Sequence, residues 1–393
     1  MVDAITKIAV EKSVDAVIIA GDLFDRAIPS VEAVTLWEQA IAALSETGAQ
    51  IIAIAGNHDS ARRVSVHSRI LEASGVSIRG SLDRIADPIM VKGATDSNPV
   101  AVYAVPYLDP IMARSVLMDT AGTDNADDPA DDDESDDDAP TPSTRRRVTH
   151  ADVTKAALDL IRSDLATRGT PRSVVVAHTF VSGGTTSDSE RSITLGNVEN
   201  VPVDTFDGVD YVALGHLHGP QRFDGGRVAY SGSPLPYSFS EEHHSKSVRI
   251  VDLGPDGPPE VEVIPLEVGM RLATIEGEIH NLLNDPSFDS AESAYVRVRL
   301  TDRDLPQQAM NQLRVRFPKA LEMRHIGPGS SAPADQQVDP SGPSRRERPP
   351  IELAVEFFAE QEGRQVDSDE HELLDEALSH ALSKQSEMQG STP

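Results

Sequence analysis

The sequence predicts an α/β fold in which a mainly parallel sheet is covered by helices on its faces. Two observations support this prediction: short apolar strands alternate with amphipathic helices, and clusters rich in Asp and His follow four of these strands directly. Such alternation is typical of parallel sheets, because two parallel strands need a crossover connection that is usually a helix.

The elements nearest the N-terminus are the clearest. Apolar residues recur at helical spacing over residues 3–12 and form a continuous β-rich run over residues 14–20, which predicts a helix followed by a strand. Ser30 is an expected N-cap and Gly48 an expected stop, so a helix should reach Thr47. Further helices are expected over residues 62–73 and 152–167, and further strands over residues 50–55, 101–105, 173–177, 211–214, 228–231 and 247–253.

The length of 393 residues suggests two or three domains, at roughly 100 to 200 residues each. A first domain is expected over residues 1–265, with a disordered insertion at 121–147, because residues 124–138 carry ten acidic side chains and no basic one. A small α+β capping domain should follow at residues 266–327, in the order strand, helix, strand, helix, strand. Residues 328–350 have linker composition, and residues 351–393 are expected to form a helical tail.

The composition excludes several classes of function. The formal net charge of −29 excludes attraction of the whole surface to nucleic acid or anionic lipid, so any anion-binding site must be local. The absence of cysteine excludes thiolate nucleophiles, disulfides and Cys-based metal sites, and a bound metal would need His and carboxylate ligands. Apolar runs fall far short of the ~18 residues of a membrane span, and the N-terminus lacks a signal-peptide pattern. A cytoplasmic protein is expected.

Four polar clusters stand directly after predicted strands. They are GDLFD at residues 21–25, GNHD at residues 56–59, the isolated His178, and GHLHG at residues 215–219. Loops at the carboxyl ends of strands in an open α/β sheet converge on one crevice, so these clusters should meet in space. Their carboxylates, amide oxygen and imidazoles form a mixed N/O set that suits Mn²⁺, Fe²⁺ or Zn²⁺. One carboxylate can bridge two ions, as phosphoryl chemistry requires.

These blocks resemble signature motifs of the calcineurin-like metallophosphoesterases. Within that superfamily, the segments beginning at His178 (HTFVSGGTTSDSER), Gly215 (GHLHGPQ) and Tyr230 (YSGSPLPYSFSE) are similar to the SbcD family, the nuclease subunits of bacterial SbcCD DNA-repair complexes. The resemblance covers nearly the whole chain outside the acidic insertion. It implies a four-layer α/β/β/α fold, a β-sandwich flanked by helices, followed by the capping domain and the tail.

The resemblance also implies a site for two divalent metal ions, with Mn²⁺ the expected metal. Asp22 would bridge the two ions, and Asn57, His178 and His216 would complete one metal site. His218 would join Asp22 at the other site.

Two further residues gain roles by the same resemblance. His58 would stabilise the charge on the scissile phosphate or protonate the leaving oxygen, and Asp59 would orient its ring. The implied reaction is hydrolysis of DNA phosphodiesters in repair, recombination and replication. Double-strand exonuclease activity and hairpin-opening or single-strand endonuclease activity are the implied forms.

One block of the family is not found before Asp22. SbcD-like chains open with a strand ending in Asp-x-His that supplies the other two ligands of the His218 metal, whereas this sequence begins inside the first expected helix. One metal site therefore has its four expected ligands and the other has two. We expect a start placed too far downstream or a truncation. Two alternatives stay open: a non-catalytic or impaired SbcD-like subunit, and a phosphatase or phosphodiesterase of the same superfamily.

Basic residues beside the expected cleft are the candidates for contacts with the DNA backbone. Residues 295–326 carry seven basic and three acidic side chains, and the segment after GNHD adds further bases. The candidates are Arg62, Arg63, Arg297, Arg299, Arg314 and Arg316.

The tail carries an apolar stripe on each of its two expected helices, and short amphipathic helices after a flexible linker often mark a partner surface. By resemblance, residues 351–393 would bind an SbcC-like ATPase, in a heterotetramer that contains a homodimer of this chain. No membrane association is expected.

Overall fold

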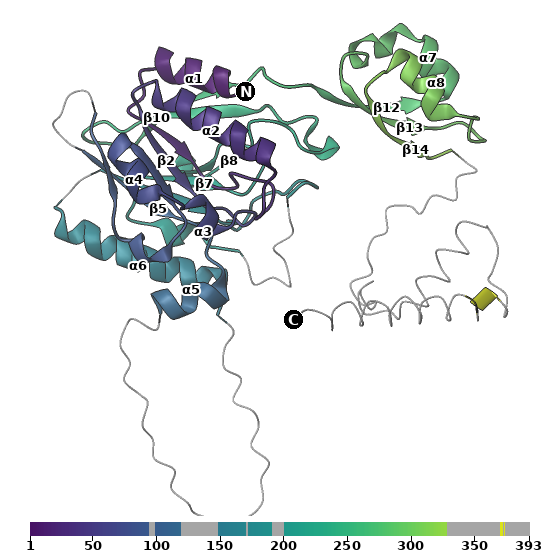
Figure 1. Cartoon of the computed structure of the whole chain (residues 1–393). Coiled ribbons are helices and arrows are strands. Elements are labelled where there is room, and N and C mark those ends of the chain that lie inside the picture. The colour runs from purple at the N-terminus through teal and green to yellow at the C-terminus, as the bar shows by residue number, and fades with distance from the viewer. Residues whose placement is uncertain are drawn as a thin grey trace, which may run out of the picture. The chain divides into compact units, whose positions relative to one another are not determined.

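The computed structural model describes residues 1–93, 99–118, 148–169, 172–190 and 200–327, with residues 370, 371 and 373. The chain divides into two compact units, Met1–Ser330 and Ser331–Pro393, and the helices and strands given below all lie in the first (Figure 1). The predicted acidic insertion, linker and tail, at residues 121–147, 328–350 and 351–393, lie outside the described residues apart from those three positions.

Two sheets form the centre of the first part of the chain. The smaller sheet is wholly parallel and has the order β1 (Ala16–Ile19), β2 (Gln50–Ile54), β3 (Val76–Arg79). The larger sheet has the order β4 (Ile89–Val91), β5 (Val100–Val105), β6 (Ser173–His178), β7 (Tyr211–Gly215), β9 (Val228–Tyr230), β8 (Gln221–Phe223). Its four central strands are parallel, and its two edge strands are antiparallel to their neighbours.

The period of two along each strand explains how both sheets acquire two buried faces. In β2, Ile52 and Ile54 pack between the two sheets, against residues of β5 such as Val102, while Ile51 and Ala53 face the opposite way. Because successive side chains of a strand point to opposite faces, the continuous apolar run of β2 is what a strand covered on both sides requires.

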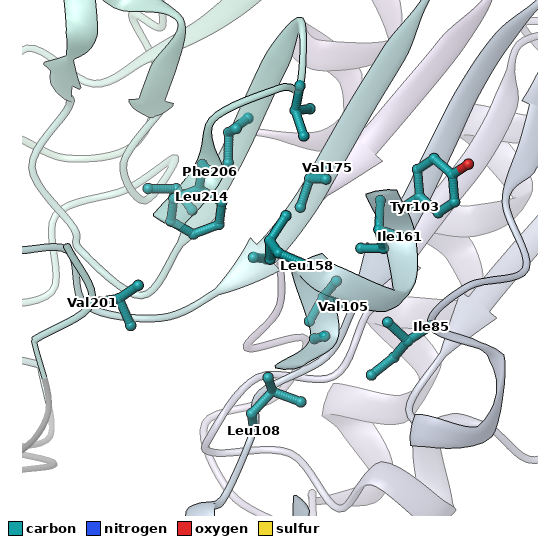
Figure 2. Packing of buried hydrophobic residues seen from close by; sticks show 14 of the residues in the cluster. Ile85, Tyr103, Val105, Leu108, Leu158, Ile161, Val175, Val201, Phe206 and Leu214 are labelled. Carbon is teal, nitrogen blue, oxygen red and sulfur yellow. The ribbon is translucent and has the colours of Figure 1, made fainter. Parts of the chain in front are cut away.

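Helices cover the outer face of each sheet. On the smaller sheet, α1 (Val2–Glu11) and α2 (Val31–Ser45) contribute Ile5 and Leu44 to the outer core. On the larger sheet, α5 (Pro110–Leu117) and α6 (His150–Thr167) lie on the outer face, where Leu158 and Ile161 pack against Tyr103 and Val175 (Figure 2). The molecule thus has the predicted four layers, helix, sheet, sheet, helix.

The predicted helix over residues 62–73 is wrong as one continuous element. The segment forms α3 (Ala61–Val64), α4 (Ser68–Leu71) and the 3₁₀ turn η1 (Glu72–Ser74). His67 separates α3 from α4 in the left-handed conformation, with φ of 62°, and a residue in that conformation ends a right-handed helix. Four more 3₁₀ turns occur in this part, at η2 (Leu82–Arg84), η3 (Val203–Phe206), η4 (Asp224–Gly226) and η5 (Phe239–Glu241).

Two smaller sheets follow along the chain. The hairpin β10 (Ser247–Asp252) and β11 (Glu260–Pro265) is antiparallel. After it come β12 (Leu272–Gly277), α7 (Ile279–Asn284), η6 (Pro286–Ala291), β13 (Tyr295–Leu300), α8 (Ala309–Arg316) and β14 (Ala320–His325), in which the three strands form a parallel sheet with its own buried core. The predicted order of strand, helix, strand, helix, strand is found here, while the domain limits at residues 265 and 327 stay predictions. Among the described residues, no helix combines the length and apolar character needed to cross a membrane.

Candidate metal centre

The carboxyl ends of β1, β2, β6 and β7 and the loops after them bring their polar residues together. The ligand atoms of Asp22, His178 and His216 all lie within 4.8 Å of one another. Asn57, from the loop after β2, lies between the two rings, with its Oδ1 at 2.8 Å from Nε2 of His178 and 3.2 Å from Nδ1 of His216. The four residues predicted for one metal site are therefore neighbours in space.

The tautomer of His178 follows from its other nitrogen. Nδ1 lies 2.8 Å from the carbonyl oxygen of Ala20, and because a carbonyl only accepts, Nδ1 must carry the proton. In the neutral ring, Nε2 then presents a lone pair toward Asn57 Oδ1 and toward Asp22 Oδ2, which is 3.3 Å away. In that form three acceptor atoms lie together, an arrangement that a cation among them stabilises, whereas without a cation a proton on Nε2 can bond to the two oxygens.

The charge states of the cluster suit a cation. Burial alone would raise the pKa of Asp22, but the His178 ring and the backbone amide of His58 hold it at about 2, so the carboxylate is ionised at neutral pH. Burial, together with the nearby His178 ring, lowers the pKa of His216 to about 3, so this imidazole stays neutral and keeps a lone pair for coordination.

The backbone of the site is held in conformations that are costly outside this context. Asp22 and His216 have positive φ, 51° and 106°, although neither is a glycine. Gly56 is required for a different reason, because a Cβ at this position would collide with the Asp22 carboxylate and amide. The loop after β2 can approach the loop after β1 only without a side chain here.

The predicted role of Asp59 in orienting His58 is not what the structure shows. The Nδ1 atom of His58 lies 2.9 Å from the carbonyl oxygen of Asp25, which sets the ring. The Asp59 carboxylate instead accepts hydrogen bonds from the backbone amides of Gly56, Leu23 and Phe24, at 2.8 to 3.0 Å. Asp59 thus ties the GDLFD loop to the GNHD loop.

The GDLFD loop is also anchored by an aromatic contact. The ring of Phe24 lies edge-on to Trp37 of α2, with 6.1 Å between centroids. Trp37 packs at the outer core of the smaller sheet, so the loop is attached to the helical layer on that side.

His218 is not in the group of three ligands and has different neighbours. Its Nδ1 lies 3.0 Å from Oε1 of Glu241 and 2.7 Å from Oγ of Ser189, and its ring packs against Tyr237. The sequence reasoning missed Glu241, although this residue stands in the YSGSPLPYSFSE segment. Its neighbours in the sequence are mainly Ser and Glu, which are usually exposed, so the sequence alone does not indicate that the Glu241 side chain is fully buried.

The six predicted arginines lie in two separate regions. Arg62 and Arg63 are exposed on α3, directly after the GNHD loop. Arg316 is engaged within the fold, because its guanidinium pairs with Asp289 and Glu292 and donates to carbonyl oxygens at the end of α7. The others lie on β13 and α8, where Arg299 pairs with Glu276 at 3.3 Å, Arg297 donates to Thr274 at 3.3 Å, and Arg314 donates to the carbonyl of Ala320 at 3.3 Å.

The residues present fit one divalent cation. A carboxylate, an amide oxygen and two imidazoles form a four-ligand N/O set of the kind that Mn²⁺, Fe²⁺ and Zn²⁺ prefer. For a second ion, the resemblance implies Asp22 and His218, and His218 is not among the ligand atoms grouped within 4.8 Å of one another.

Two family models match the chain. One, described as calcineurin-like phosphoesterase, matches residues 1–220, and one described as type 5 capsule protein repressor C-terminal domain matches residues 262–362. Among curated proteins, the chain is 29% identical over 313 residues to the D subunit of the nuclease SbcCD of Staphylococcus epidermidis, a match that covers 79% of this chain and 75% of that protein. Among solved structures, it is similar to TT1561 of Thermus thermophilus, with a TM-score of 0.33 and 13% identity over 59% of this chain and 83% of that chain.

Proposed function

Because the chain belongs to the calcineurin-like phosphoesterase family, whose model matches residues 1–220, we propose that it cleaves DNA phosphodiesters and acts with an SbcC-like ATPase. Membership of the family makes the protein a metal-dependent hydrolase of phosphate esters. The similarity to the SbcCD nuclease subunit of S. epidermidis supports DNA as the substrate. The match over residues 262–362 supports a capping region and tail beyond the catalytic part.

The convergence of Asp22, Asn57, His178 and His216 is the observation that carries this proposal. These side chains lie at or just after the ends of four different strands. Asn57 and His216, whose side chains are in hydrogen-bond contact, are 159 positions apart in the chain. A carboxylate oxygen, an amide oxygen and imidazole nitrogens brought this close together can share one bound cation as their common partner. This grouping supports a site for a positive ion.

Bound divalent cations supply positive charge to the phosphate group and lower the pKa of a coordinated water. The chain's own contribution is to preorganise the ligand side chains. Hydrogen bonds from His178 to Ala20 and from the His58 amide to Asp22 fix two ligands before an ion binds, so that little reorganisation is needed on binding.

His58 is proposed to act on the phosphate itself. With Nδ1 bonded to the Asp25 carbonyl, Nε2 is the remaining polar atom of the ring. A proton on Nε2 can stabilise charge that develops on a phosphate oxygen, or pass to the leaving oxygen of the cleaved strand.

The finer parts of the proposal concern DNA and the partner. Arg62 and Arg63 are proposed to contact the DNA backbone. Both are exposed, and they lie four and five residues after His58, the proposed catalytic residue. Residues 351–393 are proposed to bind the ATPase, and Mn²⁺ is the proposed metal. Exonuclease action on duplex ends and opening of hairpins are the proposed activities.

The test is cleavage by the purified full chain with Mn²⁺, alone and with the ATPase, on linear duplex DNA, a DNA hairpin, bis(p-nitrophenyl) phosphate and p-nitrophenyl phosphate. We expect cleavage of both DNA substrates and of the diester, with loss in the His178→Ala variant. His243→Ala is the matched control, because the His243 side chain is 88% exposed, and it should cleave normally.

Two results would overturn the proposal. Hydrolysis of the monoester without cleavage of DNA would favour a phosphatase of the same superfamily. Binding of Mn²⁺ by calorimetry without hydrolysis of any substrate would favour an impaired subunit.

A further inference from the structure

A buried charged cluster contacts the Nδ1 side of the His218 ring. The Glu241 side chain is fully buried, and its Oε2 pairs with Nζ of Lys246 at 2.5 Å. Its Oε1 faces Nδ1 of His218 at 3.0 Å and also accepts from the hydroxyl of Ser189. We call Ser189, Glu241 and Lys246 the Glu241 cluster.

The Glu241 cluster is costly if it serves the fold alone. Desolvating a carboxylate and an ammonium group offsets most of their mutual attraction, so a buried ion pair stabilises a fold little compared with apolar side chains. The side chain of Lys246 is only 6% exposed, so both charges of this pair are removed from water. A second role would explain why a charged pair occupies this position.

The cluster fixes the backbone of His218 as well as its ring. Nζ of Lys246 donates to the His218 carbonyl at 3.0 Å and to Oγ of Ser233 at 2.8 Å, and the amide of Ser233 donates to the same carbonyl. The His218 amide donates to Glu190. Both sides of the residue are therefore held.

The same contacts determine where the proton of the His218 ring resides. An ionised carboxylate only accepts hydrogen bonds, and the salt bridge to Lys246 keeps Glu241 ionised. Nδ1 must then carry a proton, so in the neutral ring the lone pair is on Nε2. Carboxylate-to-imidazole contacts of this kind orient histidine ligands in many metal sites and raise their basicity.

We propose that Glu241 is a positioning residue, which through its bond to Nδ1 presents His218 Nε2 as a ligand for the second cation. The inference rests on the proposed metal site at Asp22 and His218, and it assigns a role to a residue outside the ligand set. Lys246 supports it by holding the carboxylate and the His218 carbonyl together. Glu241 itself touches neither the cation nor the substrate.

The first test reads the ring directly, in the metal-free full chain. With ¹⁵N-labelled histidine, the ring-nitrogen chemical shifts of His218, assigned with a His218→Gln variant, should show the proton on Nδ1. In Glu241→Gln, the new amide group can donate to Nδ1, so the Nε2-protonated tautomer should gain population. The double variant Glu241→Gln, Lys246→Met removes both charges together and guards against unfolding caused by an unpaired buried lysine.

The second test measures Mn²⁺ binding by calorimetry. In both Glu241 variants, the weaker class of sites should lose affinity by about ten- to a hundredfold, while the site of His178 and His216 keeps its affinity. Glu242→Gln is the matched control, since this neighbouring carboxylate forms its ion pair with the exposed His243. Its shifts and affinities should equal those of the unaltered chain.

The outcomes separate this inference from the proposed function. His218 protonated on Nε2 in the unaltered chain, or unchanged shifts and affinities in the double variant, would overturn the role of Glu241. A chain that shows the expected tautomer and affinity changes but cleaves no DNA would refute the nuclease proposal and leave the role of Glu241 intact.

Discussion

Asp22 and His216 occupy backbone conformations that cost about 1–3 kcal/mol each for residues other than glycine. Strain of this size persists only where the surroundings determine the conformation. At Asp22 they do so through the His58 amide, and through the Asp59 carboxylate, which binds the amides of Leu23 and Phe24. The geometry of the ligands therefore depends on residues that bind no metal.

Substitution of His58 and of His178 should have separable effects. His58→Ala should reduce cleavage by about 10²–10⁴-fold and leave Mn²⁺ affinity almost unchanged, because the ring acts on the phosphate. His178→Ala should weaken Mn²⁺ binding by more than about tenfold, because it removes a ligand. Calorimetric titration with Mn²⁺, alongside DNA cleavage, measures both. Equal loss of metal in the two variants would show that His58 belongs to the metal site.

Gly56→Ala should displace a ligand without removing one. The added Cβ would collide with the Asp22 carboxylate, so Mn²⁺ affinity should fall by about tenfold or more, as expected when a ligand loses its orientation. Gly254→Ala is the control, because the nearest atom to its Cβ would be 3.7 Å away. Unchanged Mn²⁺ binding in Gly56→Ala would indicate that the two loops can move apart.

The sequence predicted which residues converge, but not how they are held. Asp22, Asn57, His178 and His216 each follow an apolar strand, so the topology of a parallel sheet sufficed to place them at one edge. The partners of Asp59 and Glu241 depend on the paths of loops that the apolar periodicity does not encode. The role predicted for Asp59 was wrong for this reason.

At the scale of elements, strong periodicity predicted the long helices and central strands to within a few residues. The segment over residues 62–73 failed because its apolar residues fit a single helix, while the left-handed His67 breaks it. The strand β3 (Val76–Arg79) was not predicted, since its Ser and Arg conceal that all four residues are buried. Arg79 tolerates burial through an ion pair with Glu72.

That ion pair makes stability depend on pH. Burial would raise the pKa of Glu72, but hydrogen bonds from Arg84 and Arg79 hold it below its ordinary value of 4.5. A carboxyl with a lowered folded-state pKa stabilises the fold above the unfolded value, and the stabilisation declines as the pH falls below about 4.5.

Glu72→Gln should lower the free energy of unfolding at pH 7 by about 2 kcal/mol, because charged hydrogen bonds to two arginines are lost. It should also flatten the decline in stability between about pH 5 and pH 3. Urea denaturation across this range measures both effects, with Glu38→Gln on the exposed face of α2 as the control. An unaltered pH profile would exclude Glu72 as a source of acid sensitivity.

At the scale of the molecule, the alternation of apolar strands with helices predicted a mainly parallel sheet covered on its faces, whereas the four-layer arrangement with two sheets was implied only by the resemblance to the metallophosphoesterases. The antiparallel edge strands β4 and β8 were not predicted, since each has three residues and too little periodicity to detect. The predicted contacts of the basic residues with DNA stay predictions. Arg316 counted as a candidate for DNA contact, whereas its hydrogen bonds fasten α8 to the end of α7.

Truncation after Pro350 should abolish co-purification with an SbcC-like ATPase while leaving Mn²⁺ binding intact. The buried clusters of the described residues all lie before residue 321, so the melting temperature should change by no more than a few degrees. Deletion of residues 124–138 is the matched control, since it removes an acidic segment of the chain and should leave the complex intact. A complex that survives truncation after Pro350 would assign the interface to residues 1–350.

The contact between Phe24 and Trp37 makes intrinsic tryptophan fluorescence a candidate probe of the site. Trp37 is the single tryptophan of the chain, and its neighbour Phe24 lies two residues after Asp22 on a loop that Asp59 ties to the GNHD segment. A cation bound at Asp22 would place positive charge two residues from the ring that contacts this indole. We therefore expect tryptophan emission to change as the site fills, which would report its occupancy without a dye or an engineered label.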